Sequence, residues 1–237
     1  MTFTLLAADP DHGLLAAASA SRSLAVGNAV IAIDPAVGVV ASQAWTNREL
    51  RARMLDALAD GRRPAEVMAQ VSVWDGGAEL RQVAAMLPTG EADVRTGADT
   101  TPWAGSRLHP GLAVLGNLLT GPEVLDAVAD TYLGWQPDDE AADEPIGAVA
   151  QLSRRVVAAM LAGERAGGDR RGKQSSAVIV TRCQPQRAFP PELDLDLRVD
   201  DDDEPMRRLA ALVEAQIAVY RESWPRTTSA FERADGA

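Results

Sequence analysis

The chain has 237 residues, 46% of them hydrophobic and 24% charged, so it can bury a full core and is not a disordered chain. Acidic residues outnumber basic ones by 34 to 23, and the net charge of −11 argues against binding to nucleic acid or to an anionic membrane surface. The single cysteine, Cys183, excludes an intramolecular disulfide and fits a cytoplasmic protein.

Short apolar runs at the start of the chain predict β-strands. Residues 3–8 and 14–19 flank the turn sequence Asp9-Pro10-Asp11-His12-Gly13, which is typical of a hairpin. A second pair of runs, 30–33 and 37–42, flanks another turn that contains proline. Because these runs are apolar almost without alternation, we expect strands that are buried on both faces.

The rest of the chain alternates between helical periodicity and further short strands. Apolar residues recur at helical spacing in five segments, after Asn47, from Pro64, from Pro122, from Ile146 and around 209–220. Strands are expected at 80–87, 92–96, 112–115, 177–181 and 193–199. This order lacks regular βαβ alternation, so it predicts an α+β fold of two sheets with helices outside. We assign residues 1–225 to one domain and 226–237 to a disordered tail.

Thr2 is the first candidate catalytic residue. An initiator methionine that precedes a small residue is normally removed, which would give Thr2 a free α-amine with a pKa of about 7.7–8.0. Such an amine can accept the proton of the Thr2 hydroxyl, a mode of activation that needs no histidine. The polar run Ser19, Ser21 and Arg22 ends the next strand and is suited to hold the terminus. The alternative is that Thr2 only opens a strand and that this run is a polar strand end.

A glycine-rich charged segment, 167–175, separates the fourth predicted helix from a buried strand. Its three glycines permit a closely folded loop, and the guanidinium group of Arg171 can bind a carboxylate through two donors. We therefore include Asp169, Arg171, Gln174 and Ser175 among the candidate site residues. The alternative is a solvated connection.

Two further features have structural and functional interpretations. Gln43 and Asn117 carry amide donors that could stabilise an oxyanion, or could cap a strand and a turn. The acidic run 200–204 could bind a hard cation, but it lacks EF-hand spacing, and a solvated helix start explains it better. We expect neither a metal nor a cofactor.

Several segments together resemble the DUF1028 family of proteins similar to Ntn (N-terminal nucleophile) hydrolases. They cover residues 2–8, 18–27, 38–47, 102–105, 116–117, 121–124, 166–175 and 196–201. The resemblance extends over about residues 2–215 and adds Trp103 to the candidate substrate-binding residues. It implies a four-layer αββα sandwich in which Thr2 attacks an amide.

The same resemblance implies roles for other parts of the chain. The segment 43–47 matches the strand whose backbone N–H serves the oxyanion in the wider superfamily. Asn117 falls at a position that lines the site, and Asp169 falls in the loop that helps to orient the terminus.

The sequence therefore predicts an N-terminal nucleophile hydrolase that acts on an amide or cyclic amide of a small molecule. The alternative is a catalytically silent protein of the same fold that binds a ligand or forms a structural oligomer. The sequence leaves the existence of a homo-oligomer open.

Overall fold

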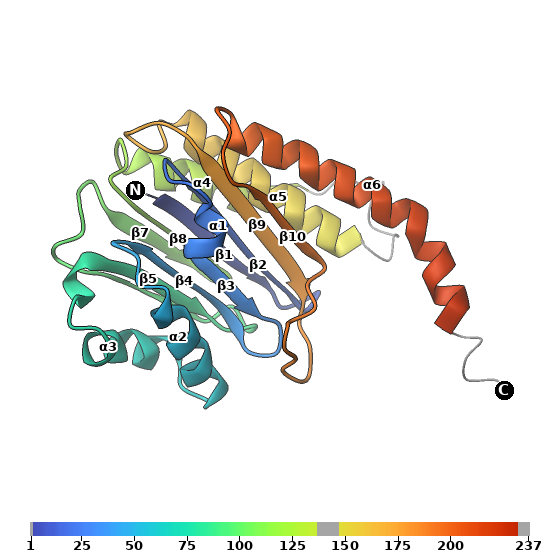
Figure 1. Cartoon of the computed structure of the whole chain (residues 1–237), viewed down its shortest axis with the longest axis horizontal. Helices are drawn as coiled ribbons and strands as arrows, with labels where there is room; N and C mark the ends of the chain where they lie inside the picture. The colour runs from blue at the N-terminus through green and yellow to red at the C-terminus, as the bar shows by residue number, and fades with distance from the viewer. Residues whose placement is uncertain (1, 137–146, 232–237) are drawn as a thin grey trace.

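The computed structural model describes residues 2–136 and 147–231, which form two antiparallel β-sheets and six α-helices (Figure 1). The strands are β1 Thr2–Asp9, β2 Leu14–Ser21, β3 Ile31–Asp34, β4 Gly38–Ala44, β5 Arg81–Met86, β6 Ala92–Thr96, β7 Gly105–His109, β8 Leu112–Asn117, β9 Ser175–Arg182 and β10 Leu195–Val199. The helices are α1 Val26–Ala29, α2 Glu49–Ala59, α3 Pro64–Trp74, α4 Glu123–Leu133, α5 Gly147–Arg165 and α6 Pro205–Phe231, with a short 3₁₀ turn at Ala78–Leu80. The expected α+β class is confirmed.

The strand at the start of the chain lies inside a sheet. The larger sheet has the order β10-β9-β2-β1-β8-β7, and the smaller one has the order β3-β4-β5-β6. β1 pairs with β2 through the predicted hairpin and with β8 on its other side. The strand predicted at residues 3–8 is confirmed, and β1 lies inside the sheet with a paired strand on either side.

Three apolar clusters define the layers of the molecule. One cluster joins inward residues of both sheets, such as Leu6 from β1 and Val39 from β4, so the sheets pack face to face. A second joins the outer face of the larger sheet to α4, α5 and α6, and a third joins the outer face of the smaller sheet to α2 and α3. Figure 1 shows α5 and α6 on one side of the strands and α2 and α3 on the other.

Small side chains explain why these layers lie close together. β2 has the sequence LLAAASAS, and all eight residues are buried. Its odd positions, such as Leu15 and Ala17, face the smaller sheet, and its even positions, such as Ala16 and Ala18, face the helices. Because a strand alternates its side chains between two faces, a run without polar alternation requires cover on both faces.

The structure also differs from the sequence prediction in several places. It adds two elements that were not predicted, α1 and β7. β7 is the edge strand of the larger sheet, and none of its residues is fully buried, so it lacks the apolar run that marks the inner strands. Helix α6 continues through Phe231, so residues 226–231 of the expected tail belong to that helix. Residues 232–237 of that tail, and the expected helix start at Ile146, lie outside the described residues.

Across the described part of the chain, no helix combines the length and the apolar character that crossing a membrane requires.

Candidate functional site

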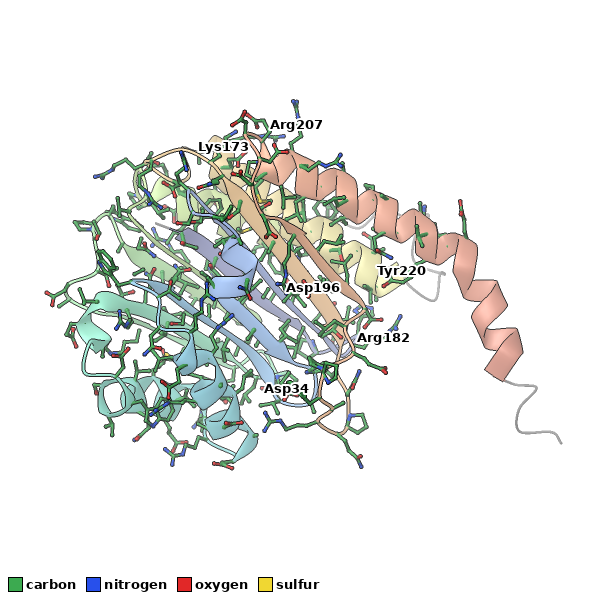
Figure 2. All side chains as sticks on the ribbon, viewed as in Figure 1. Asp34, Lys173, Arg182, Asp196, Arg207 and Tyr220 are labelled. Carbon is green, nitrogen blue, oxygen red and sulfur yellow. The ribbon has the colours of Figure 1, made fainter. Side chains whose placement is uncertain are left out.

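Thr2 begins β1 and lies in a row of polar residues that crosses the larger sheet. It is opposite Ser21 on β2 and opposite Asn117 on β8, and Ser21 is opposite Ser175 on β9. All four residues are buried. The registers of the strands therefore bring together four predicted site residues that the sequence places up to 173 positions apart. The row lies at the end of β9 near Lys173, opposite the end marked by Arg182 (Figure 2).

The hydroxyl of Thr2 faces the space between the two sheets. Leu6, on the same face of β1, belongs to the core between the sheets, whereas Phe3 and Leu5 belong to the core under the helices. Thr2 Oγ1 donates to Ser21 Oγ at 3.2 Å, and Thr2 is only 6% exposed. This end of the space between the sheets is polar, while the rest of that space is filled by aliphatic side chains.

The smaller sheet contributes two buried glutamines to this polar end. Gln43 on β4 and Gln82 on β5 are direct cross-strand partners, and both are completely buried. Gln43 Nε2 donates to the carbonyl oxygen of Thr2 at 3.3 Å, and Asn117 Nδ2 donates to the same oxygen at 3.4 Å. The backbone of Thr2 is therefore bound by amides from both sheets.

Gln43 and Asn117 use the same amide groups to bind Gln82. Gln43 Nε2 lies 2.8 Å from Gln82 Oε1, and Asn117 Nδ2 lies 3.2 Å from it. Since each amide nitrogen carries two hydrogens, these contacts and those to Thr2 occupy all of them. Their geometry suits them to position Thr2, and it leaves no side-chain N–H for an oxyanion.

Thr4 on β1 adds two more hydrogen bonds to the buried polar network around Thr2. Its hydroxyl lies 2.9 Å from Ser19 Oγ and donates to Gln43 Oε1 at 2.6 Å. Ser19, predicted as an orienting residue, therefore reaches Gln43 through Thr4. Both Thr4 and Ser19 are completely buried, so these bonds satisfy groups that have no access to solvent.

Asp169 fastens the glycine-rich loop to the end of β2. Its carboxylate accepts hydrogen bonds from the backbone N–H of Arg22 at 2.7 Å and of Arg171 at 2.8 Å, and it pairs with the Arg171 guanidinium group at 3.3 Å. The Asp169 side chain is 4% exposed. The loop packs closely against Thr120 at Gly167, where φ is +123° and a Cβ atom would lie 2.3 Å from Thr120 Oγ1.

Ser175 and Gln174 hold the chain that follows β2. Ser175 Oγ accepts from Val26 N at 3.0 Å and donates to the carbonyl oxygen of Ser23. Gln174 N donates to Ser21 O at 3.1 Å, and its side chain accepts from Arg22 Nη1 at 2.6 Å. Neither Asp169 nor Ser175 forms a hydrogen bond with Thr2 within the described residues. Their role at a free terminus stays a prediction.

A small pocket opens beside this loop, at the end of β1 and β2. Its lining includes Phe3 and Ser21 from the strands and Asp169 and Lys173 from the loop. Lys173 Nζ pairs with Glu164 at 3.0 Å and with Glu204 at 2.8 Å. The hydrogen bond to Glu204 raises the pKa of Lys173, so this amine stays charged. The pocket thus combines an apolar base with charged groups and reaches the serine that binds the Thr2 hydroxyl.

Trp103 lies on the other face of the larger sheet. A Cβ atom on Gly105 would lie 2.7 Å from the Trp103 ring, so the ring covers this glycine. Gly105 is the cross-strand partner of Gly116, and Gly116 is the partner of Phe3, whose side chain belongs to the core under the helices. The half-buried Trp103 packs against the core under the helices. The structure does not bring it to the Thr2 hydroxyl.

Gln82 and Thr4 belong to the site but were missed in the sequence. Gln82 shares a face of β5 with Ala84 and Met86, and Thr4 shares a face of β1 with Leu6, and these neighbours belong to the core between the sheets. A polar residue at an inward position of a buried strand was the available signal.

Comparisons with known proteins identify the family of this chain. Residues 2–209 match DUF1028, a family of unknown function. The chain belongs to the DUF1028 family. A solved structure of another DUF1028 protein, SPO2555 from Silicibacter pomeroyi, is 31% identical and superimposes with a TM-score of 0.76. The alignment covers 90% of this chain and 85% of that one. Among curated proteins, none matches the chain.

Proposed function

We propose that this DUF1028 protein is an N-terminal nucleophile hydrolase that cleaves an amide or cyclic amide of a small molecule. Thr2 is the nucleophile once Met1 has been removed. The observation that carries the proposal is the placement of Thr2 at the start of a central strand, with its hydroxyl directed between the sheets and its carbonyl bound by Gln43 and Asn117. A nucleophile needs such a rigid attachment, because small displacements of a reacting group lower rates steeply.

The order of the layers supports the same proposal. Two helices, the smaller sheet, the larger sheet and three further helices follow one another across the molecule. We take this order as support for the αββα sandwich that the Ntn-hydrolase resemblance implies, with Thr2 at the start of an inner strand.

The chemistry uses the Thr2 α-amine as the base. The amine accepts the hydroxyl proton, directly or through one water, and the oxygen attacks the carbonyl carbon of the substrate. The amine then transfers the proton to the leaving nitrogen, the C–N bond breaks, and an ester to Thr2 forms. A water molecule hydrolyses this ester and restores the hydroxyl group.

The oxyanion formed during the attack needs donors other than the two side-chain amides on Thr2. Both of those amides already bind the Thr2 carbonyl and Gln82. We assign this role to the backbone N–H of Thr46 or Asn47, because the N–H of Trp45 already donates to the carbonyl oxygen of Leu80. Backbone donors are fixed in place before the reaction, which makes them effective at stabilising developing charge.

The segment 45–47 is held in place by an ion pair. Arg81 Nε binds Asp75 Oδ2 at 2.8 Å, and Arg81 also donates to the carbonyl oxygen of Trp45. Asn47 Nδ2 donates to Asp75 at 2.9 Å, and its Oδ1 accepts from the N–H of Glu49 at the start of α2. Asn47 thus binds the first N–H of α2 and also ties the segment to Asp75.

Covalent trapping tests the proposal directly. The purified protein is treated with a panel of β-lactones and activated esters, and the product is digested and mapped by mass spectrometry. We expect a protein without Met1 and acylation at Thr2, with no such adduct in Thr2→Ala. Retention of Met1, or acylation only at residues other than Thr2, would leave the silent binding protein as the better account.

A further inference from the structure

Gln82 is the residue of the buried network with the most hydrogen-bond partners. It lies on β5 of the smaller sheet and is completely buried. Its Nε2 lies 3.0 Å from each of three oxygens, Thr96 Oγ1, Gly105 O and Gly116 O. Gly105 and Gly116 belong to the larger sheet, so this one side chain connects the two sheets.

The backbone determines which end of the Gln82 amide faces which way. Peptide carbonyl oxygens accept hydrogen bonds and cannot donate them. The atom that faces Gly105 O and Gly116 O must therefore be the amide nitrogen, because an oxygen there would repel both carbonyls. Gln82 Oε1 consequently faces Gln43 and Asn117, at 2.8 and 3.2 Å.

The orientation of the Gln82 amide determines the orientations of the Gln43 and Asn117 amides. Because Gln82 Oε1 can only accept, both Gln43 and Asn117 must present their NH₂ groups to it. The same NH₂ groups lie 3.3 and 3.4 Å from the carbonyl oxygen of Thr2, so both donate to it. Either amide in the reversed orientation would instead place its oxygen near that of Thr2.

The orientation of Gln43 also determines the hydroxyl directions beyond it. With its nitrogen toward Gln82, Gln43 directs Oε1 to Thr4 Oγ1 at 2.6 Å, so the Thr4 hydroxyl must donate there. Thr4 has one hydroxyl hydrogen, and its contact with Ser19 Oγ at 2.9 Å therefore has Ser19 as the donor. A single directed chain of hydrogen bonds runs from two backbone carbonyls to Ser19.

We infer that Gln82 is a positioning residue that orients the Gln43 and Asn117 amides so that both donate to the Thr2 carbonyl. Its role toward a nucleophile rests on the proposed function, whereas the orientation of the amides does not. Gln82 itself does not touch Thr2; it acts through the two amides. The groups that bind Gln82 in the described structure are all uncharged, so its own contacts do not change with pH.

The Thr2 carbonyl can be observed on its own. Thr2-Phe3 is the only Thr–Phe dipeptide in the sequence, so labelling threonine with carbonyl ¹³C and phenylalanine with ¹⁵N gives one correlation peak in an HNCO spectrum. The carbonyl shift in this peak reports the hydrogen bonds that Thr2 O accepts. It can be measured whether or not the protein is active.

Two variants of Gln82 are compared with the wild type. Gln82→Met has a similar volume but cannot bind either amide, and we expect its Thr2 carbonyl shift to move and its kcat to fall about a hundredfold with little change in KM. Gln82→Glu places a carboxyl group against Gly105 O and Gly116 O, which raises the pKa of that carboxyl group. Its protonated form can still donate to a carbonyl and accept from both amides. Its Thr2 shift should therefore match the wild type at low pH. As pH rises, Gly105 O and Gly116 O repel the ionised carboxylate, so its position against the two amides and the Thr2 shift should change.

Val83→Ala is the matched control, because Val83 is completely buried on the same strand but faces the core under α2 and α3. It lowers stability without touching the network, and we expect an unchanged Thr2 carbonyl shift and kcat. The inference would be overturned if the Thr2 carbonyl shift were unchanged in Gln82→Met. It would also be overturned if Val83→Ala changed the Thr2 carbonyl shift and lowered kcat as much as Gln82→Met does. If Gln82→Met does not fold, the pH-dependent shift of Gln82→Glu decides the question by itself. If Thr2→Ala is as active as the wild type, the proposed function fails, and the Thr2 carbonyl shift still decides whether Gln82 orients the amides.

Discussion

The Asp169 carboxylate accepts a hydrogen bond from the backbone N–H of Arg22 at 2.7 Å, although the two residues lie 147 positions apart. Arg22 directly follows Ser21, whose hydroxyl oxygen accepts the hydrogen bond from Thr2. The loop before β9 is thus attached one residue away from the group that holds the candidate nucleophile. This attachment joins the second half of the chain to the site at the start of β1.

We expect Asp169→Ala to loosen this loop. The substitution removes the acceptor of two backbone N–H groups, those of Arg22 and Arg171, and should lower the free energy of unfolding by about 1–3 kcal/mol. Hydrogen exchange at these two amides should accelerate, which mass spectrometry or NMR can measure. Asp203→Ala, at an exposed aspartate, serves as the control. Equal exchange in both variants and the wild type would contradict the anchoring role.

Variants of Thr2 should show what its hydroxyl group contributes to activity. Thr2→Ala deletes the hydroxyl that we propose as the nucleophile but keeps a small residue that permits removal of Met1. Stability should therefore change by only about 1 kcal/mol. Hydrolysis of any amide substrate should fall by orders of magnitude, because the remaining groups cannot replace the nucleophile. Thr2→Ser should retain part of the rate. Steady-state kinetics of the three proteins on one substrate give the answer, and equal rates for the wild type and a folded Thr2→Ala protein would rule out the mechanism.

Asp75 should make the fold sensitive to acid. Hydrogen bonds from Arg81 hold the pKa of this buried carboxyl group well below its usual range, with further bonds from Asn47 and the N–H of Gly77. A depressed pKa in the folded state stabilises the protein above the ordinary pKa of about 3.9, and this contribution is lost as pH falls toward the lower folded value. We therefore expect Asp75→Asn to cost about 1–3 kcal/mol at neutral pH and progressively less in acid.

Urea unfolding at a series of pH values measures this difference. Asp126→Asn is a suitable comparison, because Asp126 pairs with Arg107 but its side chain is 49% exposed. Exposed pairs contribute about 0–1 kcal/mol, so this variant should differ little from the wild type. A difference between Asp75→Asn and the wild type that does not shrink in acid would show that the Asp75 charge is not the stabilising feature.

Tyrosine ionisation should occur unusually late in the native protein. Burial raises the pKa of Tyr132 to about 12, despite the Arg155 guanidinium group 3.8 Å from its ring centroid, and burial also raises the pKa of Tyr220. These are the only two tyrosines. The unfolded chain releases both protons near pH 10, so above this pH the unfolded state binds fewer protons and stability falls as pH rises.

Ultraviolet absorbance of tyrosinate during an alkaline titration tests this expectation. The signal should rise late or together with unfolding, and Tyr132→Phe should remove its most shifted component. A native protein in which both phenols titrate near pH 10 would be inconsistent with the buried position of Tyr132.

Most residues of the site could be predicted from the sequence, but the hydrogen bonds between them could not. Thr2, Ser21 and Asn117 were candidates because of their residue types and positions at strand ends, and the registers of β1, β2 and β8 bring them together. Gln82 was missed because its partners lie on other strands and mostly on the other sheet. Trp103 was included through family resemblance, and the structure places it over Gly105 on the face that the helices cover.

Local sequence patterns are enough to predict the inner strands, the first hairpin and the α+β class. These depend on local composition, since doubly apolar runs such as LLAAASAS can only be stable when both faces are covered, and turn residues determine where the chain reverses. Tertiary structure alone decided which polar groups meet at Thr2. Gln43, Gln82 and Asn117 come from three strands in two sheets, and their hydrogen bonds exist only after the sheets pack and exclude water. Burial without solvent then requires these side chains to bind one another, and so the packing of the sheets determines how Thr2 is held.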